Sequence, residues 1–165
     1  MARPALSSAP GAPGICATDV ARGVSRLFHG LGLNVLCEVP LPNGRRADML
    51  AIDAKGQVTI VEVKVAQADL NTDAKWPAYL EFCDRFFWAL APDLDSALLD
   101  GEAYLPARSG VIVADRYGAE IVRAAAVHPL APARRKAELL RVARLAMRRH
   151  MTAADPELAL LHADG

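Results

Sequence analysis

An acid and a base stand two residues apart inside an unusually apolar stretch of the chain. The stretch VTIVEVKV, residues 58–65, has the branched apolar composition of a buried β-strand, yet it contains Glu62 and Lys64. Buried charges destabilise a fold unless a partner neutralises them. Because side chains alternate along a strand, Glu62 and Lys64 point to the same side as Val58 and Ile60. We therefore expect this end of the strand to emerge at a cleft.

A second acid, Asp48, is expected opposite Glu62 on the preceding strand. If residues 54–56 form a three-residue loop, with the final glycine in the left-handed conformation, Asp53 pairs with Gln57. Counting back along that ladder places Asp48 directly opposite Glu62 on the same face, with Cβ atoms roughly 5 Å apart. A two-residue loop would instead put Asp48 on the other face, so the arrangement depends on this register.

Two opposed carboxylates and a neighbouring lysine suggest metal-assisted chemistry. The carboxylates repel each other unless a cation lies between them, and Mg²⁺ prefers such an all-oxygen site while keeping several waters. Lys64 could then orient or help to deprotonate a water, and could offset negative charge on a phosphoryl oxygen. The simpler alternative is a salt bridge on an exposed edge strand, with Asp48 in a turn. The flanking valines argue against an edge.

Hydrophobic periodicity and turn signals predict the elements that position these residues. A first helix is expected from Thr18, its N-cap, to about Gly30, and a second from a cap at Asp73, with Trp76 and Tyr79 on its core face. A last, long helix is expected over about 132–150. Strands are predicted over residues 33–39, 46–53, 58–65, 85–91, 109–115 and 119–125. The order α-β-β-β-α-β-β-β-α predicts an α/β fold, with a mixed β-sheet flanked by helices.

Length and composition predict one folded domain. The chain has 165 residues, of which 53% are hydrophobic and 23% charged. Residues 1–16 are expected to form a disordered tail, residues 17–151 the domain and residues 152–165 a C-terminal tail. The three cysteines lack the spacing of a disulfide framework or a zinc site, and no apolar run is long enough for a membrane. We expect a cytoplasmic protein. Its zero net charge excludes a wholly polybasic nucleic-acid binder.

Asp48 on one strand, followed by VEVKV on the next, resembles the motif of the PD-(D/E)XK nuclease superfamily. That motif is an Asp on one strand and (Asp/Glu)-x-Lys on the next. The resemblance implies a restriction-endonuclease-like core. It also implies that Asp48, Glu62 and the backbone carbonyl of Val63 bind Mg²⁺ or Mn²⁺, and that Lys64 supports the attacking water.

A longer segment, RRADMLAIDAKGQVTIVEVKVAQADLNTDAKWPAYLEFCDRFFWALAPD, is similar to the MmcB family of bacterial DNA repair proteins. The similarity covers most of residues 18–150, and KWPAYLEFCDRF is its most distinctive part. It implies a role in repairing DNA damage, including crosslinks, with DNA and other repair proteins as partners. It also implies a nuclease-like activity and association with the nucleoid when the protein acts.

The sequence departs from the superfamily pattern in two places. Ala47 precedes Asp48 where the motif has proline, a change that leaves the carboxylate in place. Many superfamily members also carry a Glu in the first helix as a further metal ligand. Here that helix offers only Asp19, and Glu38 on the first strand is the alternative. The number of metal ions is therefore open.

Basic residues suggest where DNA would lie. At about 100° per residue, four arginines of the last helix share one side, opposite an expected core stripe of Leu139, Leu140, Ala143, Ala146 and Met147. This basic side predicts phosphate contacts, with an ordinary solvated face as the alternative. Arg45, Arg46 and Lys75 are further predicted phosphate contacts near the acids. The predicted DNA-binding set is thus Arg45, Arg46, Lys75, Arg134, Arg141, Arg144 and Arg148.

The sequence is compatible with two functions. The first is a Mg²⁺-dependent endonuclease that hydrolyses phosphodiester bonds during DNA repair, with Asp48, Glu62 and Lys64 as its catalytic residues. The second is a DNA-binding scaffold that keeps the nuclease fold with little or no cleavage and recruits repair partners. The intact acid–acid–lysine trio favours the enzyme, whereas the missing helix acid favours the scaffold. The oligomeric state is left open, a homodimer included.

Overall fold

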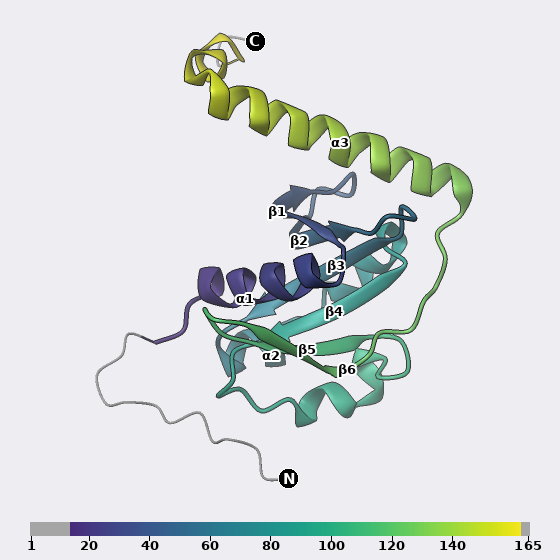
Figure 1. The fold of residues 1–165 in the computed structure, drawn as a ribbon. Helices are drawn as coiled ribbons and strands as arrows, with labels where there is room; N and C mark the ends of the chain where they lie inside the picture. Colours follow the sequence, from purple (N-terminus) through teal and green to yellow (C-terminus); the bar gives the residue numbers. More distant parts are fainter. Residues whose placement is uncertain (1–13, 163–165) are drawn as a thin grey trace.

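The computed structural model describes residues 14–162 and contains the predicted elements in the predicted order (Figure 1). The helices are α1 (Ala17–Gly30), α2 (Gln67–Thr72) and α3 (Pro132–Ala154). The strands are β1 (Asn34–Pro40), β2 (Arg46–Ile52), β3 (Val58–Lys64), β4 (Arg85–Leu90), β5 (Gly110–Ala114) and β6 (Ala119–Arg123). The part of the chain that the structure describes also contains four 3₁₀ helices: η1 (Trp76–Phe82), η2 (Ala97–Asp100), η3 (Glu102–Tyr104) and η4 (Pro156–His162).

The strands form one six-stranded mixed sheet in chain order. β1, β2 and β3 are antiparallel, β3, β4 and β5 run parallel, and β6 returns antiparallel to β5. Each parallel step needs a crossover, which α2 with η1 provides first and η2 with η3 provides second. β3 is therefore an interior strand with both faces covered, which explains its continuous valines. The predicted fold class, a mixed sheet flanked by helices, is confirmed.

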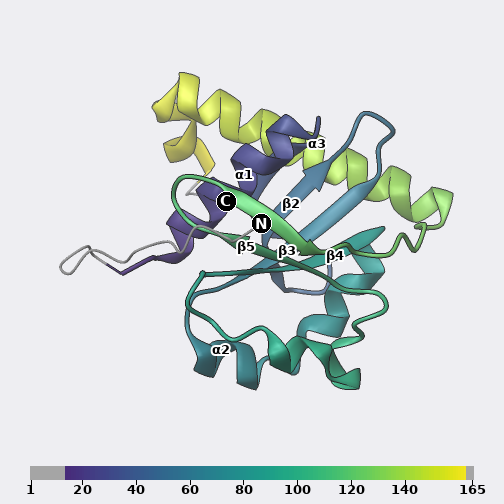
Figure 2. The ribbon, with the colours of Figure 1, turned by 60° about the horizontal axis from the view of Figure 1, so that its bottom comes forward.

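Figure 2 shows α1 and α2 on opposite sides of the sheet. A separate apolar cluster lies on each face. On one face, Val20, Val24 and Phe28 of α1 pack against alternate residues of β2–β5. On the other face, η1 inserts aromatic side chains against β4: Trp76 and Trp88 have ring centroids 5.5 Å apart. This second face is the one toward which Glu62 points, because it contains Ile60, two residues earlier on β3.

The loop between β2 and β3 has the predicted geometry. The Asp53 N–H donates to the Gln57 carbonyl at 3.2 Å, and Gly56 adopts a φ of +75°. The ladder continues from Ile52 opposite Val58 to Met49 opposite Val61. The predicted three-residue loop is thus confirmed, and the next pair along this register is Asp48 and Glu62.

Two helix starts differ from the prediction. The N-cap of α1 is Cys16 rather than Thr18, because the Asp19 carboxylate accepts the Cys16 N–H at 3.2 Å and so begins the helix two residues earlier. The second helix is the 3₁₀ helix η1, and its N-cap is Lys75 rather than the predicted Asp73. Asp73 lies two residues earlier, where its Oδ1 accepts the N–H groups of Lys75 and Trp76. The preceding α2 was not predicted.

α3 packs through a different side from the one predicted. Its buried residues are Glu138 and Val142, whereas Leu140 and Met147, expected in the core, are 56% and 65% exposed. Ion pairing explains the difference, because Glu138 is buried through its bond to Arg141, which also donates to the Pro40 carbonyl. The hydrophobic periodicity of α3, used alone, places charged residues such as Glu138 and Arg141 on the solvent side. α3 also continues to Ala154, so the predicted tail at 152–165 begins with its final turn.

Arginine contacts fasten α3 to the sheet. The buried Asp84 carboxylate accepts two bonds from Arg135, at 2.6 and 2.8 Å, and the N–H groups of Val58 and Leu130. Near the other end of α3, Arg149 donates to the carbonyls of Cys37 and Glu38 on the edge strand β1. The helix thereby covers part of an edge at which no other strand of residues 14–162 pairs with β1.

The predicted N-terminal tail, residues 1–16, lies outside the described residues apart from 14–16, which precede α1 without regular structure. None of the helices in residues 14–162 is long and apolar enough to cross a membrane.

Two glycines of α1 give a test of this packing. A Cβ on Gly23 would lie 2.2 Å from the Asp115 carbonyl oxygen and 2.4 Å from that of Gly118, whereas a Cβ on Gly30 meets nothing within 4 Å. We expect Gly23→Ala to lower the free energy of unfolding by about 3 kcal/mol, because backbone atoms cannot rotate away. Gly30→Ala, the control, should be neutral or stabilise by up to about 1 kcal/mol. Urea denaturation measures both, and equal effects would refute the close packing of α1.

Candidate functional site

The predicted residues gather in one pocket at the end of β3. Asp48, Glu62, Val63 and Lys64 line a pocket of about 420 Å³, together with residues from the segment after β3. Those further residues are Asp69, Thr72, Asp73 and Lys75. The two acids and the lysine, separated in sequence, therefore share one pocket, as predicted.

The carboxylates of Asp48 and Glu62 are each tied to the opposite strand. The regular ladder ends at Met49 and Val61. Beyond it, the Val63 N–H donates to Asp48 Oδ2 at 2.8 Å, and the Asp48 N–H approaches Glu62 Oε1 at 3.4 Å. These reciprocal bonds replace ladder bonds at the point where the strands diverge. They fix both carboxylates in position on the same side of the sheet.

Burial makes the negative charge of this pair unfavourable. Glu62 is only 5% exposed, and burial, followed by the charge of Asp48, raises the pKa of its carboxyl to about 8. Burial also raises the pKa of Asp48. A bound cation would reverse both effects, because it favours the ionised form.

The donor set fits a hard divalent cation. Asp48 and Glu62 supply carboxylate oxygens to the pocket, and oxygen ligands are the ones that Mg²⁺ prefers. Within residues 14–162, no three His, Cys, Asp or Glu side chains are grouped closely enough to hold a metal. A cation here would thus rely on two carboxylates, a backbone carbonyl and water, a composition typical of Mg²⁺.

Lys64 is held at the pocket by Asp73. Its Nζ lies 2.7 Å from Asp73 Oδ2, and both side chains are 13% exposed. The Nζ also lies 5.7 Å from the ring centroid of Trp88. Because Asp73 Oδ1 also accepts the N–H groups of Lys75 and Trp76, the position of Lys64 is coupled to the start of η1. The sequence did not predict this ion pair.

Tyr79 lies beside the acids, whereas the sequence favoured a core position for it over base stacking. It is buried, as predicted, and its hydroxyl donates to the Arg46 carbonyl at 3.2 Å. Burial raises the pKa of Tyr79, and the charge of Glu62 raises it further. Tyr79 therefore stays protonated beside the acids. The signal in the sequence that could have placed Tyr79 near the site was its polar hydroxyl on an otherwise apolar helix face.

The two alternatives for a further acid lie in different places. Glu38 faces Asp48 across the β1–β2 ladder, adopts a φ of +53° and pairs with Arg46 at 2.6 Å. Asp19 lies on α1, against the other face of the sheet, where it pairs with Arg116. The structure thus brings Glu38 near the pocket. As a candidate ligand, Asp19 is wrong, because the sheet separates it from Asp48.

The predicted phosphate contacts divide into two sets. Lys75 lines the pocket, and Arg45 and Arg46 lie just before Asp48 on the chain. Among the α3 residues, Arg141 is committed to Glu138 and Pro40, so its prediction as part of a free basic ridge is wrong. The other three are exposed, with Arg134 placed 5.1 Å from the Phe82 ring centroid. The exposed residues are Arg134, Arg144 and Arg148.

The fold and the pocket define a mixed α/β protein with an acid–lysine site built on two adjacent strands. The family model of MmcB-like DNA repair proteins matches residues 10–157. The chain belongs to this MmcB-like family, as its sequence resemblance indicated, and its role is in DNA repair.

A solved structure agrees with this fold. The chain is similar to the SPO1766 protein of unknown function from Silicibacter pomeroyi, with 42% identity and a TM-score of 0.76 over 86% of this chain and 92% of that one. A second match, Pyrococcus furiosus SfsA in complex with Ca²⁺, has 16% identity and a TM-score of 0.30 over 64% of this chain and 60% of that one. A TM-score that low supports no inference. No curated protein matches the chain significantly.

Glu62→Gln tests the electrostatics of the pocket. Folded Glu62 keeps its proton up to about pH 8, whereas the unfolded side chain ionises near pH 4.5, so stability falls as the pH rises through that window. Without divalent cations, Glu62→Gln should therefore raise the melting temperature at pH 8 and have little effect at pH 4. The exposed Glu81→Gln serves as control and should change neither. A Glu62→Gln effect independent of pH would contradict the raised pKa.

Proposed function

We propose that this protein is a Mg²⁺-dependent deoxyribonuclease that cleaves phosphodiester bonds during DNA repair. The observation that carries the proposal is the placement of Asp48, Glu62 and Lys64 in one pocket, with both carboxylates fixed by bonds between β2 and β3. Buried Glu62 and partly buried Asp48 repel each other, and a bound cation would relieve that repulsion. Membership of the MmcB-like family supplies the DNA context.

The residues of the pocket have distinct roles in this proposal. The carboxylates of Asp48 and Glu62 and the carbonyl of Val63 would hold the cation. When bound, Mg²⁺ polarises a phosphoryl oxygen and lowers the pKa of a nearby water. Lys64 orients the attacking water and offsets the negative charge that develops on the phosphate. Asp73 keeps the Lys64 ammonium group at the pocket through its 2.7 Å ion pair.

Cations beside the pocket would hold the DNA backbone. Lys75 lines the pocket itself, Arg45 directly precedes β2, and Arg46 begins that strand two residues before Asp48. Phosphate contacts of this kind position a nucleic acid without reading its sequence. Arg144 and Arg148 lie elsewhere, on a surface that combines cations with apolar side chains.

A second candidate is a DNA-binding scaffold with little or no cleavage, and one observation favours it. Lys64 is already engaged by Asp73, and an ammonium group held in that pair is less available to a water. In this alternative the acids would have no catalytic role, and the protein would keep the nuclease fold and recruit other repair proteins to DNA.

Cleavage assays separate the two. The protein is incubated with single-stranded, duplex, flapped and branched DNA in Mg²⁺ or Mn²⁺, and product formation is followed over time. Asp48→Asn, Glu62→Gln and Lys64→Ala should each lower the cleavage rate on the order of 100-fold or more, because each removes a group that acts on the phosphate or the water. Glu81→Gln, a change of the same kind at an exposed site, should leave the rate unchanged.

The scaffold alternative makes the opposite forecast. If the wild type and all three pocket variants are equally inert on every substrate while DNA binding persists, the nuclease proposal is wrong. If cleavage occurs but survives Glu62→Gln, the activity does not come from this pocket.

A further inference from the structure

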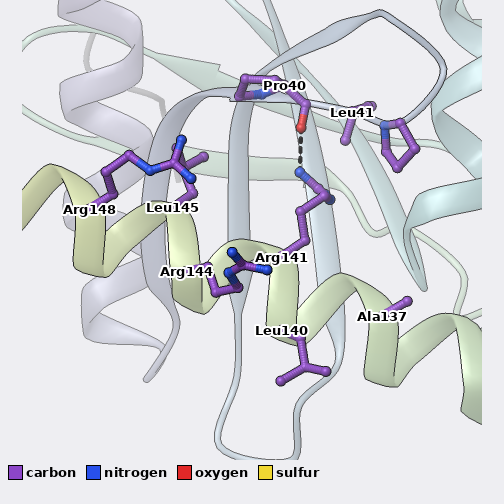
Figure 3. A pocket seen from close by; sticks show the side chains of 9 residues that line it. Pro40, Leu41, Ala137, Leu140, Arg141, Arg144, Leu145 and Arg148 are labelled. Carbon is purple, nitrogen blue, oxygen red and sulfur yellow. Dashed lines mark hydrogen bonds between the residues drawn. The ribbon is translucent and has the colours of Figure 1, made fainter. Parts of the chain in front are cut away.

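A second concave surface lies between α3 and the turn that joins β1 to β2. It is a groove of about 570 Å³, shown in close-up in Figure 3. The turn forms one wall, and α3 forms the other (Figure 3). Its lining residues are Pro40, Leu41, Pro42, Ala137, Leu140, Arg141, Arg144, Leu145 and Arg148. Arg141 bridges the two walls by donating to the Pro40 carbonyl, so the groove has a fixed frame.

The apolar part of this surface continues along α3. Leu140 at the groove is 56% exposed, and Met147 and Met151 are 65% and 54% exposed. At about 100° per residue these three side chains lie on the same side of the helix. Met147 follows Leu140 by about two turns, and Met151 follows Met147 by about one turn. A continuous exposed apolar strip on a folded protein marks an interaction surface, and methionines suit surfaces that adapt to a partner.

Positive charge flanks the same strip. Arg144 and Arg148 are exposed and line the groove, whereas the one acid of α3, Glu138, is buried against Arg141. The surface therefore offers apolar contact along its centre and cations beside it, with no accessible carboxylate on the helix. A partner must supply the opposite charge in the same arrangement.

We propose that this groove and strip bind an acidic amphipathic helical segment of another protein. Such a helix would place apolar side chains, spaced three and four residues apart, into the groove and along Leu140, Met147 and Met151. Its flanking Asp or Glu side chains would pair with Arg144 and Arg148. This is the helix-in-groove mode of recognition, in which apolar anchors provide affinity and charges set specificity.

Two other occupants fit less well. A second copy of this chain would bring the arginines of two α3 helices together, and like charges across an interface oppose association. Single-stranded DNA would use the arginines, but bases usually stack on aromatic side chains, and none lines the groove. The proposal does not depend on whether the pocket at Asp48 cleaves DNA.

A displayed peptide library tests the proposal. It contains segments of about 16 residues, roughly four helical turns, with Leu or Ile at helical spacing and mainly Glu, Asp and Ala elsewhere. Peptides are selected on the full-length protein and counter-selected on the Leu140→Glu variant. Because Leu140 is exposed, this change should leave the melting temperature unaltered, and that measurement confirms folding.

The selected peptides should bind the wild type, and their affinity for the Leu140→Glu variant should be about tenfold lower or more. The double variant Arg144→Glu with Arg148→Glu should show a loss of the same size. Arg22→Glu, a charge reversal at an exposed position of α1 outside the groove, is the matched control and should have less than a twofold effect. Glu62→Gln should bind the peptides as the wild type does, which keeps this result separate from the nuclease proposal.

Several results would overturn the proposal. One is that no peptide survives counter-selection; another is that the selected peptides bind Leu140→Glu unchanged, which would indicate charge attraction alone. If Leu140→Glu lowers the affinity for a single-stranded oligonucleotide as much as it lowers the affinity for the peptides, the groove is assigned to DNA. A concentration-dependent dimer that Leu140→Glu dissociates would assign it to a second copy.

Discussion

The candidate site depends on the register between β2 and β3, which a short loop sets. Gly56 adopts a left-handed backbone, and the Asp53 N–H bonds to the Gln57 carbonyl. Since side chains alternate along strands, a slip of one residue would move Asp48 to the α1 face and away from Glu62. The loop lies at the opposite end of the strands from the acids, yet it determines whether they meet.

The same register imposes an energetic conflict. The valines that anchor β3 in the interior of the sheet also bury Glu62, and burial disfavours its ionised form. The surrounding polar groups reduce this conflict in part. Val63 donates its N–H to Asp48, and Lys64 lies beside the acids with Asp73 as its partner. A rigid position for the carboxylates is thus obtained at the expense of apo-protein stability, a trade-off typical of functional sites.

α3 shows how one basic helix can serve two purposes. Arg135 and Arg149 bond to the body of the domain, through Asp84 and through the carbonyls of β1. Arg144 and Arg148 remain exposed beside apolar residues. The number of arginines on a helix therefore overstates its capacity to bind nucleic acid, because internal carbonyls and carboxylates compete for them. An arginine bonded in this way, such as exposed Arg149, contributes less to binding a partner than Arg144 and Arg148 do.

Local patterns in the sequence determined much of this protein. The valine-rich strand, the turn before Gln57 and the acid–lysine spacing predicted the central strands, their register and the meeting of Asp48, Glu62 and Lys64, since each depends on neighbours close along the chain. The similarity of the longer segment identified the MmcB-like family. Tertiary structure decided the contacts between distant segments: Asp73 with Lys64, Tyr79 beside Glu62, and Asp19 on the far face of the sheet. It also decided which side of α3 is buried, because the ion pair that buries Glu138 depends on where the helix meets Pro40, and helical periodicity carries no information about that meeting.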